Sequence, residues 1–277
     1  MKAASREAQE QVSGQLDELI RNSDNSVATA AQIGTELFLA VDQLDRERAL
    51  RVAVADQSLD PAQREGIMND VLGNKVAEPT KQVLAEAARH EWSSPRELRQ
   101  GLVNLGRRAL LNGAREQGQL EQVEEELFGL SVLLEREKEL TQLLSDRTAT
   151  ADKKRGLLAS VIYGKVTVFT EALALQVIGR PVSGPVDDLA AVATEVAELR
   201  GKTVARVATA EELNDSQRET LAGKLAQIYG REMAIHSEVD PSLLGGMVIR
   251  VGDEVIDGST RGKITRMRAD LAATTAY

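Results

Sequence analysis

The apolar residues of the chain recur every three or four positions as far as about residue 200, which is the spacing of one helical face. One such stripe lies near the middle of the chain, at Leu120, Val123, Leu127, Leu130 and Leu134. An earlier stripe has the same spacing, at Ile33, Leu37, Ala40 and Leu44. An amphipathic helix as a rule buries its apolar face, so these stripes predict helical cores and say nothing about function.

The two stripes belong to an internal repeat with an offset of 90 residues, which runs without gaps from Glu36 to Pro95. Matching positions include Leu37 and Leu127, Phe38 and Phe128, Gly66 and Gly156, Lys75 and Lys165, and Pro95 and Pro185. Asp60 aligns with Thr150, and both are residue types that cap helix N-termini. The repeat predicts two homologous helical bundles, residues 1–106 and residues 107–200.

The pattern changes after Gly201, where apolar residues begin to alternate in twos. Residues 233–240 alternate in this way, which predicts a strand with one buried face. Residues 247–251 and 254–257 flank Gly252-Asp253, a link that suits a type II′ hairpin turn because glycine takes the first position. Residues 201–277 are therefore predicted to form a small α/β domain, and the whole chain a mainly α protein.

Two helices complete this C-terminal domain. One is predicted to begin after Asn214, with Gln217 completing a capping box, and to end at Gly230, with an apolar face of Leu221, Leu225 and Ile228. The other follows Ser259 and has an apolar stripe of Ile264, Met267 and Leu271. Its remaining surface is basic through Arg261, Lys263, Arg266 and Arg268, which suits an acidic partner.

Composition narrows the class of partner. Hydrophobic residues make up 42% and charged residues 28% of the chain, which is typical of a folded globular protein. The formal net charge of −9 and the aromatic content of 3% disfavour nucleic-acid binding, which needs a basic face and stacking platforms. No apolar run suggests a membrane span or a signal peptide, and the chain has no cysteine. We expect protein partners, no nucleic acid, no membrane insertion and a cytoplasmic location.

No residue pattern predicts a catalytic, cofactor or metal site. Gly245-Gly246 lacks the lysine of a phosphate loop, and Asp257-Gly258-Ser259 is better explained by a helix cap than by a nucleophile turn. His90 and His236 are the only histidines and there is no cysteine, so a metal site would need mostly carboxylates. The acidic run Glu124 to Glu126 is most simply a solvated helix face, with a basic partner helix as the alternative.

The segment from Gly245 to Ser259, followed by Arg261-Gly262-Lys263, resembles the C-terminal signature of the delta subunit of bacterial F-type ATP synthase. That family is the counterpart of the mitochondrial oligomycin-sensitivity-conferring protein. The residues that carry the signature are Gly245, Gly246, Gly252, Asp253, Asp257, Gly258, Ser259 and Arg261. Residues 109–127 resemble the opening helices of the family, so the standard subunit would occupy residues 107–277. Residues 1–106 are then an added copy, similar to the longer actinobacterial delta subunits, and we expect residues 107–277 to fold without them.

The resemblance implies a non-catalytic stator subunit. A six-helix bundle would bind the N-terminal segments of the alpha subunits of the catalytic head, beside the beta subunits. The C-terminal domain, with its signature, would bind the b subunits of the peripheral stalk. The protein would then hold the head against rotor torque during proton-driven ATP synthesis, at the cytoplasmic face of the plasma membrane and without a cofactor. A helical scaffold or adaptor unrelated to ATP synthase remains the alternative.

Overall fold

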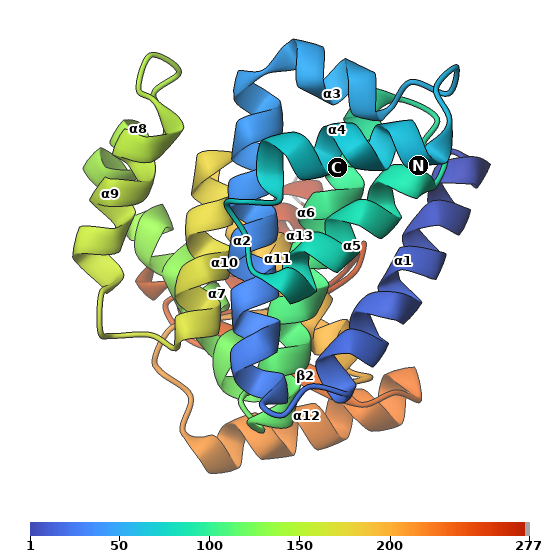
Figure 1. Ribbon diagram of the computed structural model, residues 1–277. Helices are drawn as coiled ribbons and strands as arrows, with labels where there is room; N and C mark the ends of the chain where they lie inside the picture. The colour runs from blue at the N-terminus through green and yellow to red at the C-terminus, as the bar shows by residue number, and fades with distance from the viewer. Residues whose placement is uncertain (275–277) are drawn as a thin grey trace. The chain divides into compact units, whose positions relative to one another are not determined.

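The structure, a computed structural model, describes residues 1–274, and its side chains are described as far as Met267 (Figure 1). The predicted positions of Leu271 and Arg268 on the last helix therefore lie outside the described side chains. Within the described range the chain is mainly helical and ends in a small mixed sheet, which confirms the predicted fold class. The helices before the sheet are α1 Ala3–Arg21, α2 Ser26–Arg46, α3 Arg48–Val54, α4 Pro61–Leu72, α5 Glu78–Arg89, α6 Pro95–Glu116, α7 Leu120–Arg136, α8 Lys138–Ser145, α9 Ala151–Ile162, α10 Val168–Gly179 and α11 Pro185–Leu199.

The repeat is visible in the helix bounds. Both ends of α9 lie 90 residues beyond those of α4, and the same is true of α10 and α5. The predicted caps are present at the first of these pairs. Before α4 the Gln63 side chain accepts a hydrogen bond from the Asp60 N–H at 3.1 Å, and before α9 the Thr150 hydroxyl accepts one from the Lys153 N–H. The same local signals therefore start the same helix in each copy.

Contacts divide the chain into two compact units that differ from the predicted domains. The N-terminal unit contains residues 1–123 and 147–180, and the C-terminal unit contains residues 124–146 and 181–277. The predicted boundary at 106/107 falls inside α6, which is one continuous helix from Pro95 to Glu116. By position in the repeat, α6 is both the last helix of the first copy and the counterpart of α1. The ranges 1–106 and 107–200 thus remain a prediction about how the chain was duplicated.

Close packing of α2 against α6 organises the N-terminal unit. At this crossing a Cβ on Gly34 would lie 2.6 Å from Leu110 Cγ, and a Cβ on Gly106 would lie 2.6 Å from Phe38 Cε1. Glycine is therefore required at both positions for the two helices to approach. Around the crossing lies a continuous apolar core of aliphatic side chains from α1 to α6, with Trp92 buried among them. The stripe residues Ile33, Leu37, Ala40 and Leu44 all belong to this core, as predicted.

The C-terminal unit contains a four-stranded sheet in the order β2-β1-β3-β4. Strand β1 (Thr203–Thr209) pairs parallel with β2 (Met233–Val239) and antiparallel with β3 (Met247–Val251), and β3 pairs antiparallel with β4 (Glu254–Asp257). The bounds of the β3–β4 hairpin are those predicted. Gly252 has a φ of +56°, and the next residue does not have a positive φ, as a type II′ turn requires.

Helix α12 (Asp215–Tyr229) covers one face of the sheet. It begins with the predicted Asn214–Gln217 capping box and ends at Gly230, which adopts the left-handed conformation. The core below it contains Ala205, Val207, Leu225, Met233 and Ile249. The predicted apolar face of α12 was partly wrong, because Ile228 is 67% exposed while Tyr229 packs against this core.

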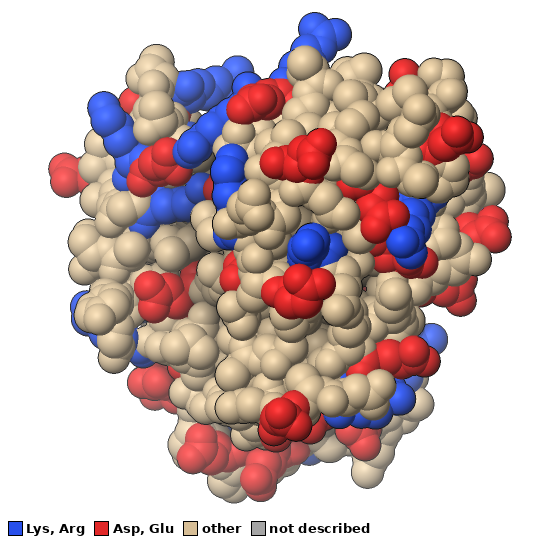
Figure 2. Space-filling view, viewed as in Figure 1, with Lys and Arg blue, Asp and Glu red and all other residues tan. Residues whose placement is uncertain are grey.

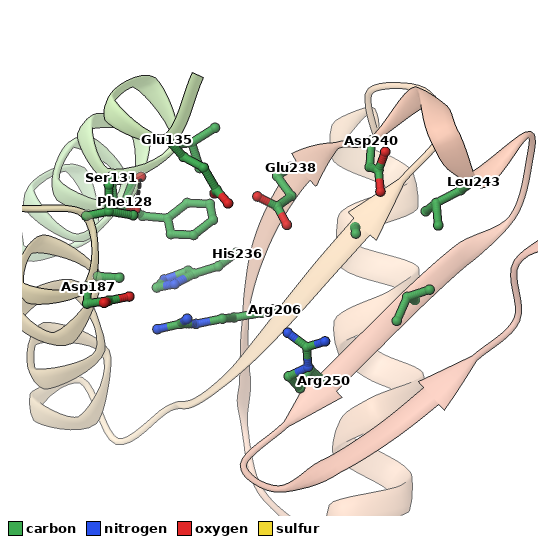
Figure 3. A pocket seen from close by; sticks show the side chains of 15 residues that line it. Phe128, Ser131, Glu135, Asp187, Arg206, His236, Glu238, Asp240, Leu243 and Arg250 are labelled. Atoms are coloured by element: carbon green, nitrogen blue, oxygen red, sulfur yellow. Dashed lines mark hydrogen bonds between the residues drawn. The ribbon is translucent and has the colours of Figure 1, made fainter. Parts of the chain in front are cut away.

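The expectation that β2 buries only one face was also wrong. Met233 and Ala234 are adjacent and both buried, and His236 is 4% exposed. Adjacent residues of a strand point to opposite faces, so both faces of β2 are covered near its start. The face opposite α12 is turned toward α7 and α11, as Figure 3 shows.

Candidate interaction site in the C-terminal unit

The predicted signature forms a connection between the sheet and the last helix, α13 (Thr260–Thr274). The carbonyl of Gly245 accepts a hydrogen bond from the Thr260 N–H at 2.9 Å, and the carbonyl of Met247 accepts one from the Gly258 N–H at 3.0 Å. Gly246 has a φ of +75°, and a Cβ there would lie 2.5 Å from the Gly258 carbonyl oxygen. The paired glycines therefore allow two backbone segments to approach closely where α13 begins.

Asp257 and Ser259 fix the start of α13. The Asp257 carboxylate accepts hydrogen bonds from the Ser259 hydroxyl at 2.7 Å and the Ser259 N–H at 2.9 Å. These two bonds hold the pKa of Asp257 below its ordinary value, with a further contribution from the charge of Arg266. The Ser259 hydroxyl in turn accepts from the Gly262 N–H at 2.9 Å, so Ser259 caps the helix as predicted.

Arg261 extends from the first turn of α13, and the other two signature residues lie elsewhere. Arg261 reaches the 3₁₀ turn Pro241–Leu243, where its guanidinium donates to the Ser242 hydroxyl at 3.3 Å. Gly252 and Asp253 form the turn at the other end of the β3–β4 hairpin. Six of the eight predicted residues are thus gathered around the start of α13 and two are not. The role of all eight in binding a partner stays a prediction.

The elements after Asp240 expose several large apolar side chains. Strand β4 is an edge strand whose four residues are all exposed. Five large apolar residues on β4, on α13 and before β3 are each between 37% and 71% exposed. They are Leu244, Val255, Ile256, Ile264 and Met267. Apolar side chains concentrated on neighbouring exposed elements are typical of a protein–protein interface. We call these five residues the terminal apolar surface.

A buried ionic cluster that the sequence did not predict lies against β2, on the face of the sheet opposite α12. His236 Nε2 lies 2.8 Å from Glu124 Oε1, and the other oxygen of Glu124 accepts a hydrogen bond from the Arg200 guanidinium. The Phe128 ring stacks on the His236 ring with the centroids 4.4 Å apart. Glu124 is only 2% exposed, so the interpretation of residues 124–126 as a wholly solvated face was wrong for its first member.

Beside this cluster the sheet is separated from α7 and α11 by a cleft of about 380 Å³ (Figure 3). Its floor carries Arg206 and Arg250, and Glu135 and Glu238 extend toward each other across it. Burial raises the pKa of Glu238 above its ordinary value, and the negative charges of Glu135 and Asp240 raise it further. Val132, Val186, Ala190, Leu243 and Val248 supply apolar parts of the lining.

These features suit protein contacts. Among the described residues there is no group of three or more His, Cys, Asp or Glu side chains placed to hold a metal ion. On the face drawn in Figure 2, basic side chains gather at the upper left with acidic side chains among them, and acidic side chains predominate over the rest of the face. Within the described helices, none has the length and apolar character of a membrane span.

Comparison with known proteins shows the family. The family model of the ATP synthase delta (OSCP) subunit matches residues 108–271. The ATP synthase subunit delta of Corynebacterium aurimucosum is 61% identical over 272 residues, covering 98% of this chain and 100% of the relative. Proteins of the same name from Corynebacterium glutamicum and Corynebacterium kroppenstedtii are 62% and 50% identical, with the same coverage of both chains. Such coverage includes both copies of the repeat, so the duplicated form is shared with these relatives. This chain belongs to the ATP synthase delta (OSCP) subunit family.

Proposed function

We propose that this chain connects the catalytic head of an F-type ATP synthase to the b subunits of its peripheral stalk, and that the connection to the stalk uses the terminal apolar surface. As a member of the delta (OSCP) family, the chain is a stator subunit of that complex. Its helical part binds the alpha and beta subunits of the head. The chain is held at the cytoplasmic face of the plasma membrane through the complex, and it carries out no chemistry of its own.

One observation carries the proposal for the stalk. The terminal apolar surface lies on an edge strand and on the helix that the signature anchors to it. An interface that resists torque must be large and slow to dissociate, and apolar area at its centre supplies much of the affinity. Anchoring of α13 by Asp257, Ser259 and the paired glycines holds part of this area in a fixed orientation. The eight signature residues would then act by positioning the surface, more than by touching the partner.

The test uses the purified full-length chain as bait for a membrane extract stripped of its ATP synthase heads. We expect b subunits to be retained directly, and alpha and beta subunits only after heads are added back. Met267→Asp should abolish retention of the b subunits, because it places a charge in the terminal apolar surface. The matched control is Ile228→Asp on α12, which alters an equally exposed apolar residue outside this surface.

Retention of the b subunits by the Met267→Asp variant at the level of the unmodified chain would place the stalk contact elsewhere. Retention of neither b nor head subunits by the unmodified chain would contradict the proposed function itself. ATPase activity in the purified chain would contradict the proposal that it is non-catalytic. The alternative of an unrelated adaptor has no support beyond the helical repeat, and the family match decides against it.

A further inference from the structure

Three basic side chains form a row across the face of the sheet that is turned toward α7 and α11. In the pairing register His236 of β2 lies beside Arg206 of β1, and Arg206 lies opposite Arg250 of β3. His236 has a buried carboxylate partner in Glu124. In the part of the chain that the structure describes, the guanidinium groups of Arg206 and Arg250 make no hydrogen bond or ion pair, and both residues are exposed.

The arrangement of Arg206 and Arg250 is unfavourable without a ligand. Like charges directly opposite each other in an antiparallel pair destabilise a sheet. Figure 3 shows the Arg206 side chain extending toward Asp187 of α11, with the Arg250 guanidinium apart from it. Each guanidinium can donate two parallel hydrogen bonds to a carboxylate. The pair would therefore be stabilised by an acidic side chain inserted into the cleft.

The opposite charge lies at the other end of the same cleft. Glu238 and Glu135 extend toward each other there with no cation within ion-pair distance among the described residues (Figure 3). The pKa of Glu238 is raised by its burial and by the negative charges of Glu135 and Asp240, and the positive charges of Arg136 and Arg206 offset only part of this rise. A basic side chain at this end would remove the repulsion.

Strand spacing sets the distance between these two ends. Glu238 is in register with Ala208, two residues along β1 from Arg206. With strands about 4.8 Å apart and alternate residues about 6.8 Å apart, the Cα atoms of Glu238 and Arg206 are about 8 Å apart. Residues one turn apart on a helix are closer together, about 5–6 Å between Cβ atoms, so long side chains would be needed to reach both ends. The apolar lining beside both ends would contact the remainder of that helical face.

We propose that the cleft between the sheet and helices α7 and α11 docks one face of a partner protein's helix, which presents an acidic side chain to Arg206 and Arg250 and a basic side chain one turn away to Glu238. The cleft adjoins the terminal apolar surface at Val255, which is opposite Arg250 in the β3–β4 register, but its charged residues lie on β1, β2, β3 and α7. The inference rests on the proposed function only in the choice of ATP synthase as the assembly for the test.

The absence of cysteine from the chain gives a direct test, because a single introduced cysteine is the only site for maleimide. Val248→Cys places the thiol in the cleft, Ile256→Cys places it on the terminal apolar surface, and Ile228→Cys places it on the outside of α12. We expect maleimide to label Val248→Cys at least about tenfold more slowly in the assembled ATP synthase than in the free chain, which corresponds to about 1.4 kcal/mol. Labelling of Ile228→Cys should be the same in both states.

Charge variants then identify the chemistry of the occupant. In the Val248→Cys background, Arg206→Gln with Arg250→Gln should restore most of the labelling in the assembly, and so should Glu238→Gln. Arg231→Gln, an exposed arginine outside the cleft, is the matched control and should not change the labelling.

The outcomes separate the two proposals. Equal labelling of Val248→Cys in both states, with Ile256→Cys protected in the assembly, would overturn the cleft proposal and leave the proposed function standing. Failure of all the variants and of the unmodified chain to enter the complex would count against the proposed function. Slow labelling of Val248→Cys already in the free chain, or protection of the free chain by inorganic phosphate alone, would also overturn the cleft proposal, because its occupant would then be the chain itself or a small anion.

Discussion

Helices α2 and α7 occupy equivalent places in the two copies of the repeat, yet their polar faces contact different parts of the chain. On α2, Asp42 contacts Arg155 at 2.8 Å and also pairs with Arg180. On α7, the position equivalent to Asp42 is Val132, and the buried carboxylate is Glu124, which contacts the C-terminal sheet through His236. The first helix thus holds α9 and the end of α10, and the second holds β2.

The phenylalanine that the two helices share shows the same divergence. The backbone carbonyl of Phe38 accepts a hydrogen bond from Arg180 at 2.8 Å, and its ring packs at the α2–α6 crossing. The ring of Phe128 instead stacks on His236. After duplication the apolar stripe was kept, and a few polar substitutions gave each copy its own neighbour.

The arginines that dock on α2 have no equivalents in the first copy. Glu65 and His90 occupy the positions that correspond to Arg155 and Arg180. Glu65 pairs with Arg89 at 2.7 Å, and His90 lies 3.0 Å from Glu86, so these side chains find partners within their own copy. The second copy therefore contacts α2 of the first copy through its arginines, while the first copy has no such arginines to offer a further unit. A terminal unit with a polar outer face is typical of repeat arrays.

Deletion of residues 1–106 should have the largest effect, because it removes the α2 contacts altogether. The sequence alone predicts a folded remainder, but the structure shows that the deletion removes α2 and cuts α6 near its middle. We expect the amides of α9 and α10 to lose their protection from hydrogen exchange, because Arg155, Arg180 and the apolar face of α10 lose their partners. Deletion of residues 1–22, which removes only α1 and its packing on α5 and α6, is the comparison and should preserve more of that protection. Full protection in residues 107–277 would establish 107 as a domain boundary.

Glu124→Gln tests the polar contact made by α7. The substitution removes the charge that compensates Arg200 and accepts from His236 in a buried site, and breaking a buried pair in this way costs about 3 kcal/mol. We expect the loss in the C-terminal unit, measured as faster hydrogen exchange of the β2 amides in the full chain. Glu125→Gln changes the exposed neighbour and should have no measurable effect. Equal exchange in the two variants would show that packing of Phe128, and not the charge, holds β2 to α7.

Asp42→Asn tests the equivalent contact of α2. Arg180 has a side chain only 5% exposed, and its Nη1 already lacks a hydrogen-bond partner, so removal of the carboxylate leaves a desolvated charge. Asp45 still lies near this arginine, at 3.4 Å, which moderates the expected loss to about 2 kcal/mol. The readout is the urea midpoint of the full chain. Glu78→Gln, at the exposed pair with Lys81, is the control and should cost under about 0.5 kcal/mol.

Local signals explain what could be predicted from the sequence. The caps at Asp60, Thr150 and Asn214 act within one helical turn, so their helices begin where the sequence says. The Gly252 turn fixes the β3–β4 register in the same local way, because two residues determine which strand positions pair. The start of α13 at Ser259 was predicted for the same reason.

Features that depend on distant parts of the chain were missed. Glu124 lies 112 residues from His236, and nothing near Glu124 distinguishes it from its exposed acidic neighbours. Its only available signal was the repeat itself, where it aligns with the packed Gly34. Gly106, beside the predicted boundary, lies inside α6, and it is a glycine because the Phe38 ring fills the space of a side chain. A glycine that a tertiary contact requires looks in sequence like the end of a helix.

The smallest expected effect concerns two equivalent carboxylates, one on α2 and one on α7, that have different neighbours. Asp45 of α2 pairs with Arg99 at 2.5 Å, whereas its counterpart Glu135 meets Glu238 across the cleft. The pKa of Glu238 is raised, so the folded chain binds this proton more tightly than the unfolded chain does. The resulting stabilisation is complete below the unfolded pKa and is lost as the pH rises through the folded pKa, which leaves an unfavourable charge at neutral pH.

Glu238→Gln should therefore raise the melting temperature of the free chain at pH 7. The difference should shrink as the pH falls below the ordinary pKa of glutamate and Glu238 becomes protonated in the folded and the unfolded chain. Because Glu238 is partly exposed, solvent screens the repulsion and the gain should stay below about 1 kcal/mol. Glu219→Gln on the exposed side of α12 is the control and should leave the melting temperature unchanged. A lower melting temperature for Glu238→Gln at pH 7 would mean that Glu238 already has a cation partner within the chain. In that case Glu238 would be neutralised within the chain, as Asp45 is by Arg99, and it would not be available to bind a basic side chain of a partner.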